Sequence, residues 1–273
     1  GVYDEPLHVP ALSTVTGPDS GDARAIIQHF DSDDDENILV SSGANSTLAN
    51  VTLRPPGLHS AVITLLRMDD VPMTVDNVVL DGNDNVFSIG ALVSGTGSST
   101  GEIANSTFRR LGFGIQAVDT AINIHDNLFE GIRQDAVFVR LPELKGFDGG
   151  ETPVLGVAGE TATGFNTFRS VSGFFVLNAN PTVTKAENND WGLDNTEDIE
   201  QRMFGEVDFL PFIGGEGEGE GEGEGEDLPV CASAPGGGFD ASGGLLVLLL
   251  FVLAARKWRE TRAAIVGRTL SGE

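Results

Sequence analysis

The run Ile103-Ala-Asn-Ser-Thr-Phe108 and the run Ile124-His-Asp-Asn-Leu-Phe129 decide the predicted fold, because they are two copies of one pattern. Each copy has Asn or Asp three residues before its final phenylalanine, and each is followed by a glycine and a second apolar run. The apolar position that ends each copy recurs along the chain, at Leu53, Leu80, Phe108, Phe129, Phe168 and Trp191. A repeat of about 21 to 28 residues with short strands predicts a β-solenoid, because one coil cannot bury its inward residues alone and stacked coils bury a continuous column.

A polar residue stands three positions before most of these apolar residues. The series consists of Asn50, Asn77, Asn105, Asp126 and Asn188, and it is broken by Phe165. Stacked coils would place these side chains above one another at one corner of the solenoid, where each amide can hydrogen-bond to the next coil. We therefore predict a structural asparagine ladder in a buried corner. His125, beside this position, is expected to be an exposed strand residue.

Composition divides the body of the chain into two segments. Residues 1–36 are expected to form a loop-rich entry, with a short helix within Ala23–Phe30 and a solvated acidic loop at Asp31–Glu36. Residues 37–213 carry recurrent Val, Ile and Leu runs without helical periodicity, which predicts strands in about five or six coils. Leu141–Ala162 is rich in Gly, Glu and Pro and is predicted to be a loop inserted into one coil, where partner contacts are expected.

The C-terminal part of the chain has a different composition. Residues 214–238 form a linker in which Gly and Glu alternate, and such a self-repelling segment is expected to be extended and disordered. Residues 239–259 contain an apolar run that ends in Arg and Lys, which predicts one transmembrane helix. Residues 260–273 are then a basic cytoplasmic tail, and the body is exported to the cell surface or outer envelope. Because the apolar run is short, a buried helix of a soluble protein is the alternative.

The charge of the chain excludes one class of partner. Asp and Glu number 41 against 16 Lys and Arg, and the net charge is −25. Such a body repels phosphate backbones, so we expect no nucleic-acid partner; it suits a solvated extracellular domain or one that binds divalent cations. Cys231 is the only cysteine, which excludes an intrachain disulfide. The chain begins at Gly1 without a signal peptide, so we expect further sequence to precede it.

Two stretches resemble a known fold family. Ile103–Val139 resembles the repeats of right-handed parallel β-helix proteins, the pectate-lyase-like superfamily. Asn189–Gly192, Asp194–Arg202 and Val207–Phe212 resemble the closing segment of bacterial β-helix repeat proteins, in which a Trp-Gly turn leads into a short helix and a final Val-Asp-Phe-x-Pro element. The resemblance implies an all-β, right-handed parallel β-helix with a short C-terminal capping helix, for which Thr196 is the expected N-cap. It says almost nothing about activity.

The tail resembles a second class of sequence. The linker, Cys231, the short apolar span and the basic cluster together are similar to the C-terminal sorting tails of Gram-negative surface proteins. In tails that contain cysteine, the region before the span can be cleaved and modified. The resemblance therefore implies that Cys231 is a processing or lipid-attachment site and that sorting or processing machinery is a partner. Residues 260–273 depart from this pattern, because such tails usually end soon after the basic cluster, so a simple membrane anchor is the alternative.

Enzymes of this superfamily cut acidic polysaccharides with Asp carboxylates, often with calcium, and with a Lys or Arg base, or else with paired carboxylates. By that resemblance, the candidate catalytic residues are Asp81, Asp84, Arg109, Arg133 and Asp135. Calcium is the one cofactor considered, and its candidate ligands are Asp81, Asn83 and Asn85. The run that contains these ligands is also typical of a tight turn, which is the favoured interpretation.

The arginines of neighbouring coils form a second candidate site. Arg109, Arg110 and Arg133 come shortly after the apolar anchors and are expected on one face, near Glu130 and Asp135. Such a face could bind a carboxylated sugar, or it could be a solvated charged surface.

Two functions fit these observations. The favoured one is a non-catalytic module of the cell surface for adhesion or for binding an extracellular glycan. The alternative is a surface-tethered polysaccharide lyase or glycoside hydrolase that acts on acidic polysaccharide. A cleft with two carboxylates and a nearby arginine would favour the enzyme, whereas a bare solenoid surface would favour the binding module.

Overall fold

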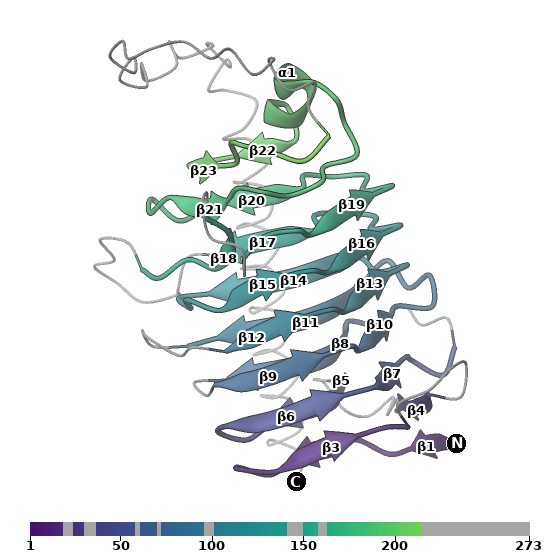
Figure 1. Ribbon diagram of the computed structural model, residues 1–273. Helices are drawn as coiled ribbons and strands as arrows, with labels where there is room; N and C mark the ends of the chain where they lie inside the picture. The colour runs from purple at the N-terminus through teal and green to yellow at the C-terminus, as the bar shows by residue number, and fades with distance from the viewer. Residues whose placement is uncertain are drawn as a thin grey trace, which may run out of the picture. The chain divides into compact units, whose positions relative to one another are not determined.

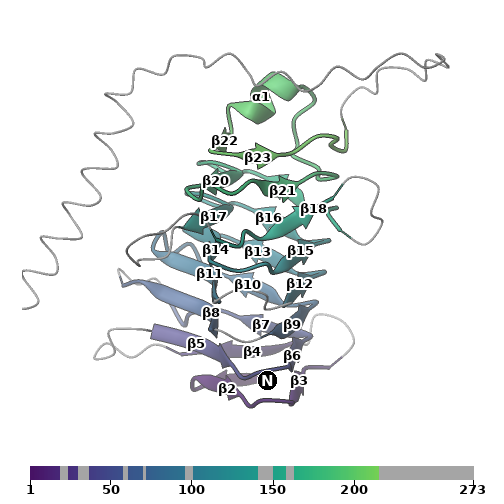
Figure 2. The same cartoon turned by 90° about the vertical axis from the view of Figure 1, so that its left-hand side faces the viewer.

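The computed structural model describes residues 1–18, 24–29, 37–57, 61–69, 72–95, 101–140, 150–157 and 163–214. In this part of the chain the strands are parallel and form three stacked sheets, named A, B and C below (Figure 1 and Figure 2). The chain visits sheets A, B and C in that order and then repeats the circuit, so each circuit up to β21 adds a strand to each sheet, and β22 and β23 then extend sheets B and C. This architecture is the predicted all-β, parallel β-solenoid.

The strands are short, and each sheet contains strands from the whole length of the described chain. Sheet A consists of β1 (Val2–Asp4), β4 (Ala25–Gln28), β7 (Val51–Leu53), β10 (Val79–Asp81), β13 (Thr107–Arg109), β16 (Leu128–Glu130) and β19 (Thr167–Arg169). Sheet B consists of β2 (Leu7–Val9), β5 (Asn37–Ser42), β8 (Ile63–Asp69), β11 (Ser88–Ser94), β14 (Phe113–Val118), β17 (Val137–Arg140), β20 (Val176–Asn178) and β22 (Met203–Phe204). Sheet C consists of β3 (Thr14–Thr16), β6 (Ser46–Ala49), β9 (Met73–Asp76), β12 (Glu102–Ala104), β15 (Asn123–His125), β18 (Val154–Gly156), β21 (Thr184–Ala186) and β23 (Val207–Asp208).

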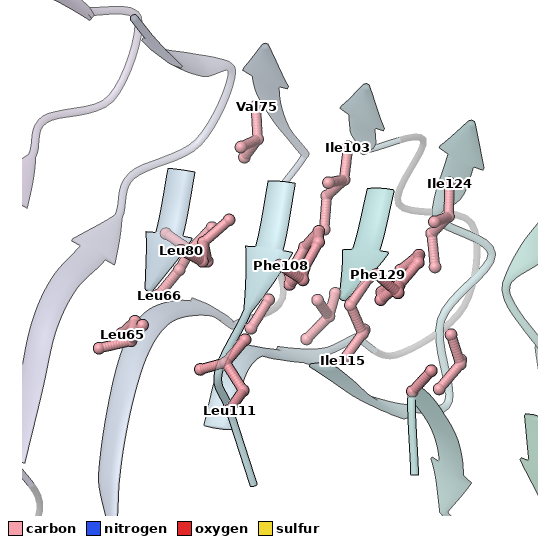
Figure 3. Packing of buried hydrophobic residues seen from close by; sticks show 14 of the residues in the cluster. Leu65, Leu66, Val75, Leu80, Ile103, Phe108, Leu111, Ile115, Ile124 and Phe129 are labelled. Atoms are coloured by element: carbon pink, nitrogen blue, oxygen red, sulfur yellow. The ribbon is translucent and has the colours of Figure 1, made fainter. Parts of the chain in front are cut away.

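The core contains a column of side chains from successive strands of sheet A. The residues in register along this column are Leu53, Leu80, Phe108, Phe129 and Phe168. The rings of Phe108 and Phe129 stack at 4.8 Å, and those of Phe129 and Phe168 stack at 4.9 Å. Figure 3 shows Ile103 beside Phe108 and Ile124 beside Phe129, so sheet C packs against the same column. The predicted alignment of the repeats is confirmed, and each buried ring contributes about 2–3 kcal/mol to folding.

Two glycines of sheet B make room for the rings of this column. A Cβ atom added at Gly90 would lie 2.7 Å from Cδ1 of Phe108, and one added at Gly114 would lie 2.9 Å from Cδ1 of Phe129. Both distances are too short for carbon atoms that are not bonded, so only glycine permits this packing. The column ends at Trp191, which stacks on the last phenylalanine at 4.5 Å.

Strands of all three sheets lie in the segment expected to be a loop-rich entry, because β1 to β4 precede residue 37. The short helix predicted within Ala23–Phe30 is wrong: Ala25–Gln28 is β4, which pairs in parallel with Val51–Leu53. Ile27 is buried in register with Leu53, so pairing with the next coil overrides the local preference. With eight strands in sheet B and eight in sheet C, the solenoid has more coils than the sequence predicts.

A short helix, α1 (Thr196–Glu200), lies at the end of the solenoid away from β1 (Figure 1). Its apolar residue Ile199 is fully buried, as expected for a helix that packs on the last coils. The N-cap is Asn195, whose Oδ1 accepts a hydrogen bond from the backbone N–H of Asp198 at 2.8 Å. The prediction of Thr196 as N-cap is therefore wrong by one residue, and Asn is at least as good a cap as Thr.

Several predicted features lie outside the described residues, which do not include 215–273. The predicted membrane segment, the cytoplasmic tail, Cys231 and all of the linker except Gly214 fall in that part. The acidic loop at Asp31–Glu36 and residues 141–149 and 158–162 of the inserted loop are also outside the described ranges. In the described part of that loop, Val154–Gly156 is strand β18 of sheet C, so the prediction of a loop is wrong there. Within the ranges that the structure describes, no helix is long and apolar enough to cross a membrane.

Candidate functional site

The predicted asparagine series occupies the turn that leads from sheet C into sheet A. All six residues at this position have positive φ angles, between 51° and 58°: Asn50, Asn77, Asn105, Asp126, Phe165 and Asn188. Asn and Asp adopt this left-handed conformation more readily than other residues with a side chain, so the repeat reflects a backbone requirement. Nδ2 of Asn77 donates to Oδ1 of Asn50 at 2.7 Å, whereas Nδ2 of Asn105 donates to Asp76 at 2.8 Å.

A ladder of buried side chains lies one residue further along these turns. Nδ2 of Asn127 donates to Oδ1 of Asn166 at 3.0 Å, and Nδ2 of Asn166 donates to Oδ1 of Asn189 at 2.9 Å. Oδ1 of Asn127 also accepts the backbone N–H of Ser106 at 2.9 Å. All four residues are at most 2% exposed, so the ladder stabilises the corner and offers no atoms to a ligand. Sequence reasoning placed it one residue too early, because the left-handed residue and the ladder residue are adjacent.

Asp81, the last residue of β10, is fully buried and is held by two arginines of the next coil. It accepts hydrogen bonds from Nε of Arg109 at 3.2 Å and from Nε and Nη2 of Arg110 at 3.0 and 2.5 Å. Burial by itself raises the pKa of Asp81, but the bonds from Arg110 and from the backbone of Asn83, with the charge of Arg109, together lower that pKa below its ordinary value. Asp81 is therefore an ionised anchor for two guanidinium groups.

The run considered for calcium forms a turn that uses its own oxygens. Oδ1 of Asp81 accepts the backbone N–H of Asn83 at 3.0 Å. Asn85 donates from Nδ2 to the carbonyl of Ala61 at 3.2 Å and accepts the backbone N–H of Phe87 at 2.9 Å. Backbone and guanidinium groups thus engage the side-chain oxygens of two of the three candidate ligands, Asp81 and Asn85. Across the described ranges, no three His, Cys, Asp or Glu side chains are grouped so that they could hold a metal ion.

An open hollow of about 600 Å³ lies at the corner between sheets A and B and is lined by Arg109, Arg110, Glu130, Gly131 and Ser170. Arg109 and Glu130 are in register at the ends of β13 and β16. Arg110, Gly131 and Ser170 take the next position in three successive turns, with positive φ angles of 53°, 65° and 53°. The side chains of Arg109 and Arg110 are 42% and 41% exposed, so they are anchored by Asp81 on one side and accessible on the other.

Charges alternate along the ends of these strands. Asp81, Arg109, Glu130 and Arg169 are in register on neighbouring strands of sheet A. Arg169 bonds in turn to the carboxylate of Asp190, at 3.0 Å through Nη1 and 2.5 Å through Nη2. Glu130 differs from the other members, because no ion pair or side-chain hydrogen bond with another described residue engages its carboxylate.

The other candidate acids and bases do not line the hollow. Nη2 of Arg133 donates to Oδ1 of Asp84 at 3.1 Å, and both side chains are about half exposed. Nη1 of Arg110 lies 3.9 Å from the same carboxylate, so Asp84 links the two arginines. Asp135 accepts the backbone N–H of Phe174 at 2.9 Å, and burial raises the pKa of its carboxyl group. The arginines thus share one face, as expected, but Asp135 is held apart from them.

His125 links two coils of sheet C and is partly buried rather than exposed. Its Nε2 lies 2.6 Å from Oε1 of Glu102, and its Nδ1 lies 2.8 Å from Oδ2 of Asp126. Carboxylates only accept hydrogen bonds, so both contacts require a ring that carries two protons. Burial lowers the pKa of His125, but the hydrogen bonds to Asp126 and Glu102 outweigh burial, and the pKa is raised above its ordinary value.

Sheet B carries aromatic side chains on its outer face, which sequence reasoning missed. Phe138, Leu177 and Phe204 are in register on β17, β20 and β22. The rings of Phe113 and Phe138 lie 6.3 Å apart, and those of Phe174 and Phe204 lie 5.8 Å apart. Phe204 is 52% exposed. The alternation of buried and half-buried residues along β17 is the signal that places Phe138 on the outside.

Comparison of the chain with protein-family models, with curated proteins and with solved structures finds no match. The resemblance to the pectate-lyase-like superfamily therefore gains support from the parallel β-solenoid alone. Because a fold does not determine an activity, the functional argument depends on the geometry of the hollow.

Proposed function

We propose that this chain is a non-catalytic module of the cell surface that binds glycans, or adheres through them, at the hollow between sheets A and B. One observation carries the proposal: Asp81 anchors the guanidinium groups of Arg109 and Arg110 from behind and leaves an accessible side facing the hollow. Arginine presents several donors in one plane, which suits the hydroxyl groups of a sugar. Because the two side chains are already held in place, a ligand orders few groups when it binds.

The proposal is non-catalytic because the candidate acids and bases are engaged elsewhere. Asp81 is buried between arginines, Asp84 pairs with Arg133, and Asp135 accepts a backbone hydrogen bond. General acid–base catalysis needs a positioned group that exchanges a proton with the substrate. Among the described residues that line the hollow, Glu130 is the single carboxylate, whereas glycoside hydrolysis ordinarily uses a pair.

A polysaccharide lyase or glycoside hydrolase is the second candidate, and Glu130 is the observation that favours it. Its carboxylate lines the hollow beside two guanidinium groups, which could stabilise a developing negative charge. Under this alternative, the protein releases new reducing ends or unsaturated products from acidic polysaccharide, with or without calcium. Glu130→Gln would then abolish that release, and the same assay with a chelator measures any calcium dependence.

The surface location is a further part of the proposal and is supported by the sequence of the tail. The apolar run within 239–259 and the basic residues directly after it suit a membrane anchor with a cytoplasmic C-terminus. Cys231, ahead of this run, is proposed as the site of processing or lipid attachment. Mass measurement of the protein recovered from cell envelopes, with Cys231→Ala as the comparison, tests this.

The coils are further proposed to be right-handed, as in about 98% of parallel crossovers.

Glycan-array binding of the full chain in mild detergent tests the binding proposal. Arg110→Ala should weaken binding about tenfold or more, because it removes donors from the hollow. Lys185→Ala is the matched control, because it removes a cation that pairs with Asp208 on sheet C. Equal losses in the two variants, or no loss in either, would contradict the assignment of the hollow.

A further inference from the structure

We infer that the hollow selects an uncharged glycan, read through neighbouring hydroxyl groups, and discriminates against acidic polysaccharide. The inference rests on the proposed function and names the class of ligand for the same site. It follows from the charges around the hollow, from the hydrogen-bonding roles of its lining and from the charge of the whole body.

The fixed charges around the hollow cancel. The positive charges of Arg109 and Arg110 face the negative charges of Asp81, which lies behind them, and of Glu130 in the lining. The neighbouring carboxylate of Asp84 is likewise paired with an arginine. A site for a carboxylated sugar needs an excess of positive charge, because bringing a second carboxylate beside Glu130 is costly. The hollow has no such excess.

The lining sets groups that only donate beside a group that only accepts. The guanidinium groups of Arg109 and Arg110 donate, and the carboxylate of Glu130, in register with Arg109, accepts. A sugar hydroxyl both donates and accepts, so two neighbouring hydroxyls can bond to arginine and to Glu130 at the same time. A uronate carboxylate accepts only, so it would satisfy the arginines and leave Glu130 facing a like charge.

Small residues keep the hollow open. A Cβ atom added at Gly131 would meet nothing nearer than the backbone nitrogen of Arg110, at 3.7 Å.

The net negative charge of residues 1–215 also disfavours acidic polysaccharide. The residues before position 216 include 31 acids and 11 bases. Such an excess of negative charge lowers the local concentration of polyanions and slows their association, and salt weakens this effect. An uncharged polysaccharide experiences no such repulsion.

Calorimetric titration of the full chain with four soluble polysaccharides tests the inference: a β-glucan and a mannan as uncharged ligands, and polygalacturonate and alginate as acidic ones. We expect the uncharged ligands to bind about tenfold or more tightly than the acidic ones at low salt, with an affinity that high salt hardly changes. Glu130→Gln should weaken uncharged binding about fivefold and strengthen acidic binding. Because Glu130 has no ion pair among the described residues, its replacement should leave the thermal melting temperature unchanged, which serves as the folding control.

Each other outcome has a defined meaning. Tighter binding of the acidic ligands that Arg110→Ala weakens would overturn the inference and leave the proposed function standing. Uncharged binding that neither Arg110→Ala nor Glu130→Gln weakens would overturn the inference, because the hollow would not be the site. Absence of binding to all four polysaccharides, together with a negative glycan array, would overturn the proposed function and the inference with it.

Discussion

The carboxylate of Asp81 accepts two hydrogen bonds from Arg110, at 3.0 Å from Nε and 2.5 Å from Nη2, although the residues are 29 positions apart in the sequence. The contact joins the last residue of β10 to the turn that follows β13, and Arg109 adds a third bond to the same carboxylate. Because Asp81 is fully buried and each arginine is about two-fifths exposed, the carboxylate fixes the guanidinium groups that line the hollow.

Replacing Asp81 by Asn should lower the free energy of unfolding by about 2–3 kcal/mol, because charged hydrogen bonds become neutral and an amide N–H faces guanidinium donors. The pKa of Asp81 is lowered in the folded protein, so its contribution is present above the unfolded value of 3.8 and is lost as pH falls through the folded pKa. Urea denaturation of wild type and Asp81→Asn should therefore differ at neutral pH and converge in strong acid. Equal urea midpoints at neutral pH would contradict the anchoring role.

The stability of the solenoid should depend on the charge of His125. Its folded pKa is raised, so the stabilisation is fully present below the unfolded value of 6.5 and is lost as pH rises through the folded pKa. Melting temperatures measured from mildly acid to alkaline pH should fall above 6.5 in the wild type. In His125→Gln, which cannot protonate, this part of the decline should disappear. An identical decline in both proteins would show that other groups cause it.

The buried ladder should matter more than the left-handed asparagines beside it. Asn166→Ala should cost about 3 kcal/mol or more, because it removes five hydrogen bonds of a buried side chain and leaves the backbone N–H of Asn127 without its acceptor. Asn105→Gly is the control: glycine accepts the positive φ, and the change removes an exposed hydrogen bond, so the cost should stay within about 1 kcal/mol. Chemical denaturation compares the two, and equal costs would refute a structural ladder at Asn166.

Phe165 offers a stabilising substitution. It has a φ of 58° and is 42% exposed, at a position where the other coils carry Asn or Asp. Phe165→Asn should raise the free energy of unfolding by about 1 kcal/mol, because Asn tolerates the left-handed conformation better. Phe165→Ala keeps the backbone strain and should show no such gain. If alanine stabilises the protein as much as asparagine, the gain comes from removing an exposed ring and not from the backbone.

Much of the fold could be predicted because each coil repeats a local pattern. Phe108 and Phe129 are recognisable as equivalent residues in the sequence, and they pair in register in sheet A. The N-terminal strands were missed, because Ile26 and Ile27 carry no copy of the turn motif and become a strand only when they pair with the next coil. The aromatic side chains on the outer face of sheet B could not be predicted, because Phe113 and Phe138 belong to different coils and come together only when those coils stack.

By itself, the sequence determined the parallel β-solenoid, because the inward residue of each coil stands at a constant distance from a turn residue, such as Asn105, that must adopt a positive φ. Only the tertiary structure decided which charges meet. A sequence alone does not distinguish an Asp that pairs with an Arg from an Asp that is solvated. The contact between Asp81 and Arg110 exists because two strands stack in one register. The hollow has the same origin: Gly131 and Ser170 leave space beside Arg110 because successive turns place them at the same corner.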